Sequence, residues 1–175
     1  MTHTPEFSRP VRIDTLGTSP RQLTIGADEK ERAALAKRFD LAAIGSLAAE
    51  AELVLRNGDI IATGTLAASV TQSCVATGVP VDARVDEAFR IIFRPPPEGN
   101  VDEEVELSEA ECDVVFYSGG AIDLGEAVAE TLSLSLDPYP RAPDADAALR
   151  EAGVMSEGEA GPFGALAALK DKLKS

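Results

Sequence analysis

The sequence predicts an α+β fold: an antiparallel β-meander, with its curvature or closure toward a barrel left open, covered by one or two helices. Three neighbouring segments alternate apolar and polar residues, and Asn57-Gly58, a strong hairpin signal, separates the first two. Such alternation is typical of a sheet with one covered face and one solvated face. A later segment, 123–136, carries a narrow apolar stripe that needs a sheet to pack on.

The N-terminal part of the chain contributes shorter elements. We expect 11–16 and 22–25 to form short strands and 28–39 to form a helix. Acidic residues, Asp28 and Glu29, stand at the start of that helix, where the positive end of the helix dipole favours them. This helix is interpreted as structural.

The meander itself runs over 47–56, 60–71 and 79–94. In each segment nearly every second residue is apolar or small, and successive side chains of a strand point to opposite faces. The residues expected to face the core are Leu47, Ala49, Ala51, Leu53 and Leu55, then Ile60, Ala62, Gly64, Leu66, Ala68 and Val70, then Val79, Val81, Ala83, Val85, Phe89, Ile91 and Phe93.

An acidic segment follows the third strand. Residues 98–113 contain no Lys or Arg. Because charges of one sign repel each other, this pattern favours a mobile, solvated loop. The alternative interpretation is that the segment attracts and binds a basic partner. Residues 113–117 then predict a short strand, and Ser118-Gly119-Gly120 turns the chain toward the covering helix.

The covering helix is predicted over 123–136. Asp123 caps its start, and Glu126, three residues on, completes a capping box. Asp137 precedes Pro138 and is therefore disfavoured in helical geometry, which ends the helix. The apolar stripe consists of Leu124, Val128 and Leu132, with Ala127 beside them.

The sequence divides into three regions: one α+β domain at 1–140, a flexible linker at 141–161 and a short amphipathic helix at 162–175. The linker is rich in Ala, Asp, Glu and Gly and poor in large apolar residues. The terminal helix either docks on the domain, which is the favoured interpretation, or holds a partner.

Composition limits the function classes. The chain has 175 residues and a net charge of −14, so its surface repels phosphate and DNA binding is not expected. No segment approaches the length of a membrane span and the start lacks an apolar signal core, so we expect a cytoplasmic protein. The acidity either attracts basic proteins or only keeps the protein soluble.

We expect no catalytic, cofactor-binding or metal site. The sole histidine, His3, lies in the N-terminal tail, so a Ser-His or Cys-His pair has no base. The glycines at 118–120 match no phosphate-binding loop. Cys74 and Cys112 lack the further ligands of a tetrahedral zinc site, and Cys74 is interpreted as a small apolar side chain at a strand end.

Three segments together resemble the YceD family of bacterial proteins. They are TQSCVATGVPVDARVDEAFRIIFRP, IDLGEAVAETLSLSLDPYPRAP and PFGALAALKDKLK, in the family's order. Members are associated with accumulation or processing of 23S ribosomal RNA, and their gene often neighbours one for a large-subunit ribosomal protein. The resemblance therefore implies a factor in assembly of the large ribosomal subunit.

The chain departs from the family at one place. Many members carry Cys-x-x-Cys before the third strand, suggesting a metal knuckle, whereas here Cys74 holds the first position and Thr77 the second. The family's later cysteine is also missing, from the region 141–144. Because Thr is a poor zinc ligand, any metal site should be lost, and the fold should hold without metal.

Two functional hypotheses follow. The first is a non-enzymatic assembly factor that binds a ribosomal protein or a pre-50S particle, with direct RNA contact left open. The second is a small-molecule-binding domain, because small residues on the inward faces could leave an apolar cavity or only let elements approach closely. The candidate contacts of the first hypothesis are Asp102, Glu103, Glu104 and Glu106, then Asp137, Tyr139 and Arg141, with Arg84, Arg90 and Arg94 as the alternative if RNA is touched.

Overall fold

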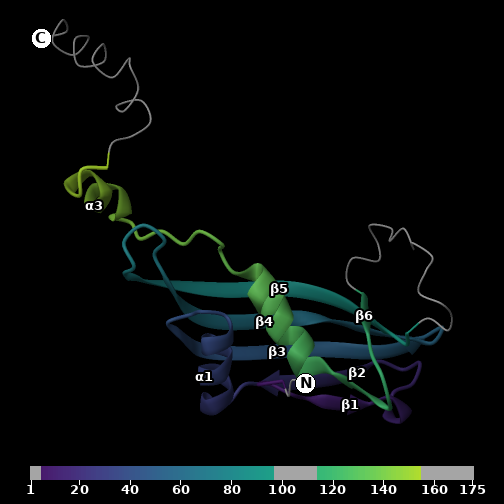
Figure 1. Cartoon of the computed structure of the whole chain (residues 1–175). Coiled ribbons are helices and arrows are strands. Elements are labelled where there is room, and N and C mark those ends of the chain that lie inside the picture. Colours follow the sequence, from purple (N-terminus) through teal and green to yellow (C-terminus); the bar gives the residue numbers. More distant parts are fainter. Residues whose placement is uncertain (1–4, 97–113, 155–175) are drawn as a thin grey trace, which may run out of the picture. The chain divides into compact units, whose positions relative to one another are not determined.

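The computed structural model describes residues 5–96 and 114–154 (Figure 1). A five-stranded sheet in the order β2-β3-β4-β5-β6 carries the core, and β1 pairs with β7 in a separate two-stranded sheet. The predicted α+β class with a mostly antiparallel sheet is confirmed, and within the described residues the sheet does not close into a barrel. The chain forms two compact units: Met1–Gln72 with Asp82–Asp137, and Ser73–Val81 with Pro138–Ser175.

The N-terminal elements differ in part from the prediction. β1 (Pro10–Arg12) is short and pairs with β7 (Ala121–Asp123), a strand that the sequence pattern did not indicate. A 3-10 turn, η1 (Ile13–Thr15), replaces the rest of the predicted first strand. β2 (Arg21–Gly26) and α1 (Glu29–Arg38) form where expected.

The meander is confirmed as the centre of the sheet. β3 (Ala43–Arg56) and β4 (Asp59–Ser73) form one long antiparallel hairpin around Asn57-Gly58, whose φ angles of 52° and 89° suit a tight hairpin turn. β5 (Pro80–Arg94) lies beside β4, and β6 (Val114–Phe116) pairs in parallel with its last three residues.

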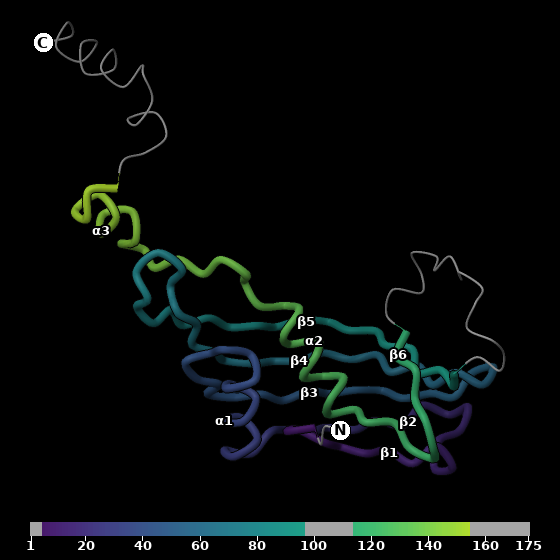
Figure 2. The backbone as a smooth tube through the Cα atoms, viewed as in Figure 1, coloured from purple at the N-terminus to yellow at the C-terminus, as the bar shows by residue number. Residues whose placement is uncertain are grey.

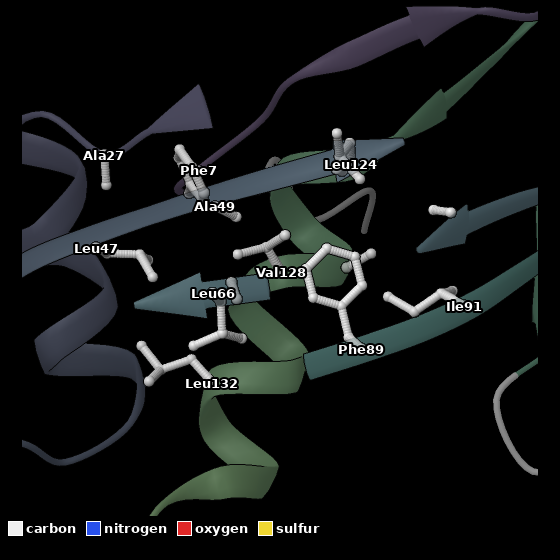
Figure 3. Close-up of a cluster of buried hydrophobic side chains, with 14 of the residues drawn as sticks. Phe7, Ala27, Leu47, Ala49, Leu66, Phe89, Ile91, Leu124, Val128 and Leu132 are labelled. Carbon is white, nitrogen blue, oxygen red and sulfur yellow. The ribbon is translucent and has the colours of Figure 1, made fainter. Parts of the chain in front are cut away.

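Helix α2 (Leu124–Ser135) covers one face of this sheet, as predicted (Figures 1 and 2). Leu124, Val128 and Leu132 are each 0% exposed. In Figure 3 the side chains of α2 project toward Leu66 and Phe89 of the sheet. The helix is therefore held by burial of its apolar stripe, each large side chain contributing roughly 1.5–3 kcal/mol.

The small residues on the inner face let elements approach closely. A Cβ placed on Gly64 would lie 2.1 Å from the main-chain oxygen of Glu50 and 2.9 Å from Cζ of Phe89. The inner-face alanines are buried in the same packed core, namely Ala49, Ala51, Ala62 and Ala68. These contacts support close packing, the second of the two interpretations of the small residues.

Two expected core residues lie outside the core of the sheet, and one of them, Val81, packs instead against the cluster of Cys74, Ala142 and Ala145. Val79 is 41% exposed because it lies in the turn before β5 rather than in the strand. Otherwise the alternation of apolar and polar residues predicts correctly which side chains face the core, and on β5 these are Val85, Phe89, Ile91 and Phe93.

Ion pairs fix the starts of both long helices. Arg38 of α1 hydrogen-bonds the carboxylate of Glu126 at 2.8 and 3.0 Å. Only half of the predicted capping box forms at α2: Asp123 accepts the main-chain N–H of Glu126 at 3.1 Å. At α1, Arg9 hydrogen-bonds Glu31 at 2.7 and 2.8 Å, which lowers the pKa of the Glu31 carboxyl.

The segment before β1 lies directly against the start of α2. The carboxylate of Asp123 accepts hydrogen bonds from Oγ of Ser8 at 2.5 Å and the main-chain N–H of Arg9 at 2.8 Å. A Cβ on Gly125 would lie 2.2 Å from the main-chain oxygen of Phe7. Only a glycine at this position permits the approach.

The region after α2 contains a short helix. This helix, α3 (Ala145–Glu151), lies within the stretch 141–161 that was predicted to be flexible. The predicted terminal helix at 162–175 lies outside the described residues, and the division into domain, linker and tail stays a prediction.

Candidate partner-binding surfaces

The face of the five-stranded sheet opposite α2 carries an acidic, hydroxyl-rich surface. In the strand register Glu50 lies between Thr24 and Thr65, and Glu52 lies between Gln22 and Thr63. All of these side chains are exposed. We call this surface the outer face and define it by Gln22, Thr24, Glu50, Glu52, Thr63 and Thr65.

The outer face combines negative charge with hydrogen-bonding groups. Its residues line one shallow hollow, and no basic side chain is among those that line it. Two carboxylates on one strand, flanked by hydroxyl and amide groups, can accept hydrogen bonds from Lys or Arg of a partner. An exposed surface of this kind attracts cations and repels phosphate.

Glu50 and Glu52 alternate with the predicted core residues of their strand and so fall on its polar side, but neither was among the predicted site residues. A signal was present: Thr63 and Thr65 stand at matching distances on the other side of the Asn57-Gly58 turn. Counting back from a two-residue hairpin turn fixes which residues face each other. The same count would have assembled this surface from the sequence.

The three candidate arginines on β5 do not form one free row. Arg84 and Arg90 are exposed. Arg94, in contrast, is half-buried and forms an ion pair with Asp59 at 2.9 Å. Asp82 stands two residues before Arg84 and accepts a hydrogen bond from Thr71. The basic surface for RNA contact is therefore reduced to two arginines with an acidic neighbour, which weakens that alternative.

The candidates that follow α2 belong to different units of the structure. Asp137 is exposed, and its main-chain oxygen accepts a hydrogen bond from the buried side chain of Gln72 at 2.8 Å. In the second unit, Tyr139 is 74% exposed, and Arg141 forms an ion pair with Asp146 at 2.7 Å. Tyr139 is the large aromatic side chain that these candidates offer to a partner.

The acidic candidates lie outside the part of the chain that the structure describes. They are Asp102, Glu103, Glu104 and Glu106. Their role stays a prediction.

The second unit contains a buried sulfur. Cys74 is 3% exposed, and its Sγ accepts the main-chain N–H of Ala142 at 3.3 Å. That N–H is the main cause that lowers the pKa of the Cys74 thiol to about 7. Cys74, Ala142 and Ala145 form one small apolar cluster, so the expected small apolar side chain at the end of a strand is found, here with a hydrogen-bonded sulfur.

This donor set does not fit a zinc ion. A structural zinc site takes four Cys, His or carboxylate ligands, and Cys74 is surrounded by a threonine and two alanines. Within residues 5–96 and 114–154, no group of three or more His, Cys, Asp or Glu side chains is placed to hold a metal ion.

Comparison with known proteins identifies a family. Residues 62–170, more than half of the chain, match the model of a family described as large ribosomal RNA subunit accumulation protein YceD. Searches of curated proteins and of solved structures returned no match. Among the described residues, no helix is long and apolar enough to cross a membrane.

Proposed function

The chain belongs to the YceD family, and from this membership we propose that it supports accumulation of the large-subunit ribosomal RNA as a non-enzymatic assembly factor in the cytoplasm. It acts by binding a ribosomal protein or a precursor particle. The family match over 62–170 is the observation that carries the proposal.

The charge of the chain decides which kind of partner fits it best. A net charge of −14 disfavours direct binding to bare RNA, because a protein binds RNA phosphates through clustered Lys and Arg side chains. Ribosomal proteins that bind RNA carry the opposite charge, so an acidic factor can shield them until they reach the RNA. Shielding of a basic ribosomal protein is therefore the form of the function that we propose.

The outer face is the described surface that suits such a partner. Glu50 and Glu52 are exposed side by side on one strand, and no described helix covers them. The acidic run at 102–106 supplies a second candidate contact, and Tyr139 supplies an apolar one. The arginines at 84 and 90 are kept as the contact for the case in which RNA is bound directly.

A pull-down with the tagged full-length chain tests the proposal. From cell lysate at low salt, we expect a large-subunit ribosomal protein or a large-subunit precursor to be recovered. Recovery should fall as salt rises through about 0.15 M, where exposed charges more than about 8 Å apart are screened. Recovery of neither species would contradict the proposal.

Matched charge variants locate the contact. Glu50→Gln with Glu52→Gln removes two charges from the outer face, and we expect it to lower recovery. Glu130→Gln with Glu151→Gln removes the same charge from exposed positions on α2 and α3, and we expect recovery to be unchanged. Equal losses for both pairs would show that only net charge matters, and no loss for the first pair would exclude the outer face.

A further inference from the structure

The second unit brings two chain segments together around one sulfur. The first segment is a tight turn at 74–79, closed by hydrogen bonds from Gly78 N to Cys74 O and from Cys74 N to Val79 O, both at 2.8 Å. The second segment follows Pro140, whose main-chain oxygen accepts the N–H of Val75 at 2.9 Å. Segments far apart in the sequence thus meet at Cys74.

Four positions converge at this meeting point. Thr77 lies in the turn, and its hydroxyl oxygen is buried without a hydrogen-bond partner among the described residues. From the second segment, Ala142 and Ala145 are 7% and 2% exposed and pack in the cluster with Cys74. Each segment therefore supplies two residues.

The spacing of these positions is that of a four-ligand metal site. Two residues separate 74 from 77, and two separate 142 from 145. Two Cys-x-x-Cys pairs brought together by the fold are the usual frame of a structural zinc site. In such a frame the sulfur of a pair also accepts main-chain N–H groups, as Cys74 does from Ala142.

We propose that the second unit is a metal-free form of a four-cysteine zinc knuckle. Positions 74, 77, 142 and 145 are its ligand positions, and only Cys74 keeps a ligating side chain. The hydrogen-bonded sulfur and the apolar packing of the two alanines replace the metal as the link between the segments. The unit therefore folds without zinc, and its backbone is still arranged to receive zinc when the three missing thiols are restored.

The first test uses the wild-type full-length chain. Purified without chelator, it should contain no stoichiometric zinc, and its melting temperature should be the same with and without EDTA. Zinc bound at one ion per chain, or a melting temperature that falls on chelation, would overturn the proposal. This test requires no variant to fold.

The second test restores the ligands. Thr77→Cys with Ala142→Cys and Ala145→Cys should bind one zinc ion per chain, show the tetrahedral absorption bands with cobalt, and acquire a melting temperature that falls on chelation. If the metal-free variant is unfolded, added zinc should refold it. A variant that is folded but gives no tetrahedral cobalt spectrum, or that zinc fails to refold, would overturn the proposal.

A matched control keeps the number of cysteines constant. Thr77→Cys with Ala147→Cys and Ala152→Cys places two thiols at exposed positions of the second unit instead of the buried ones. We expect no tetrahedral cobalt spectrum from this control. The same spectrum from both variants would show that the proposed frame is not what binds the metal, and would overturn the proposal.

Discussion

Replacement of Gly125 by alanine should reverse the usual effect of a glycine-to-alanine change on helix stability. In a helix, Gly→Ala ordinarily stabilises by roughly 0.5–1 kcal/mol, because glycine loses more backbone freedom on folding. Here the new Cβ would lie 2.2 Å from the main-chain oxygen of Phe7 and 2.9 Å from the main-chain nitrogen of Arg9. The first distance is more than 1 Å short of an ordinary contact of 3.4 Å. The N-terminal segment must therefore move away from α2.

The expected cost follows from what that movement breaks. Overpacking against main-chain atoms costs about 1–3 kcal/mol. Displacement of the segment also strains its two hydrogen bonds to Asp123, from Ser8 and Arg9, each worth about 0.5–1.5 kcal/mol. After subtraction of the helix gain, we expect the free energy of unfolding to fall by roughly 1–5 kcal/mol.

Urea denaturation followed by circular dichroism measures this change directly, because the free energy of unfolding falls linearly with denaturant. Gly17→Ala is the matched control: its Cβ would meet only the main-chain nitrogen of Ser19, at 4.0 Å. We expect the control to stay within about 0.5 kcal/mol of wild type. A Gly125→Ala protein as stable as wild type, or more stable, would refute the close approach described above.

Three further predictions test the rest of the fold. Leu132→Ala should lower the free energy of unfolding by roughly 2–5 kcal/mol because the side chain is fully buried, whereas Leu134→Ala, at an 87% exposed position, should change it little in the same urea titration. Glu31→Gln should flatten the fall in melting temperature between about pH 6 and about pH 3, because Arg9 lowers the pKa of the Glu31 carboxyl in the folded protein. The ionised carboxylate stabilises the folded protein fully above the ordinary carboxyl pKa, and this stabilisation is lost as the pH falls through the lowered pKa of Glu31. A pH profile parallel to that of wild type would contradict this. Deletion of 141–175 should leave the five-stranded sheet folded, and loss of the β-sheet dichroism signal would contradict it.

The hairpin and the covering helix were predictable because their signals are local. Asn57-Gly58 fixes the turn and the alternation on either side fixes the faces, so the pairing of β3 and β4 followed from adjacent residues. The stripe of α2 and its cap at Asp123 lie within a few residues of each other. Extended local patterns of this kind need no knowledge of distant contacts.

The features that escaped prediction depend on distant pairing. β1 and β7 are three residues each, too short to show a period, and they form only because the chain returns to pair them. The carboxylate of Glu126, predicted to complete a capping box, instead pairs with Arg38, 88 positions away in the sequence.

Contacts between distant residues also limited what the sequence could predict about the candidate sites. The outer face could be derived by counting from the hairpin turn, but the exposure of Glu50 and Glu52 depends on which face α2 covers. The family resemblance located one missing cysteine in the region 141–144, but the meeting of Cys74 with Ala142 and Ala145 could not be derived from the sequence, because it depends on how the fold brings the two segments together.

The ratio of 23S to 16S ribosomal RNA in cells depleted of this protein tests the central claim most directly. We expect the ratio to fall on depletion and to recover when the wild-type chain is supplied again. Recovery should be weaker with Glu50→Gln and Glu52→Gln than with the α2 and α3 control pair. An unchanged ratio in depleted cells would contradict a role in the accumulation of large-subunit ribosomal RNA.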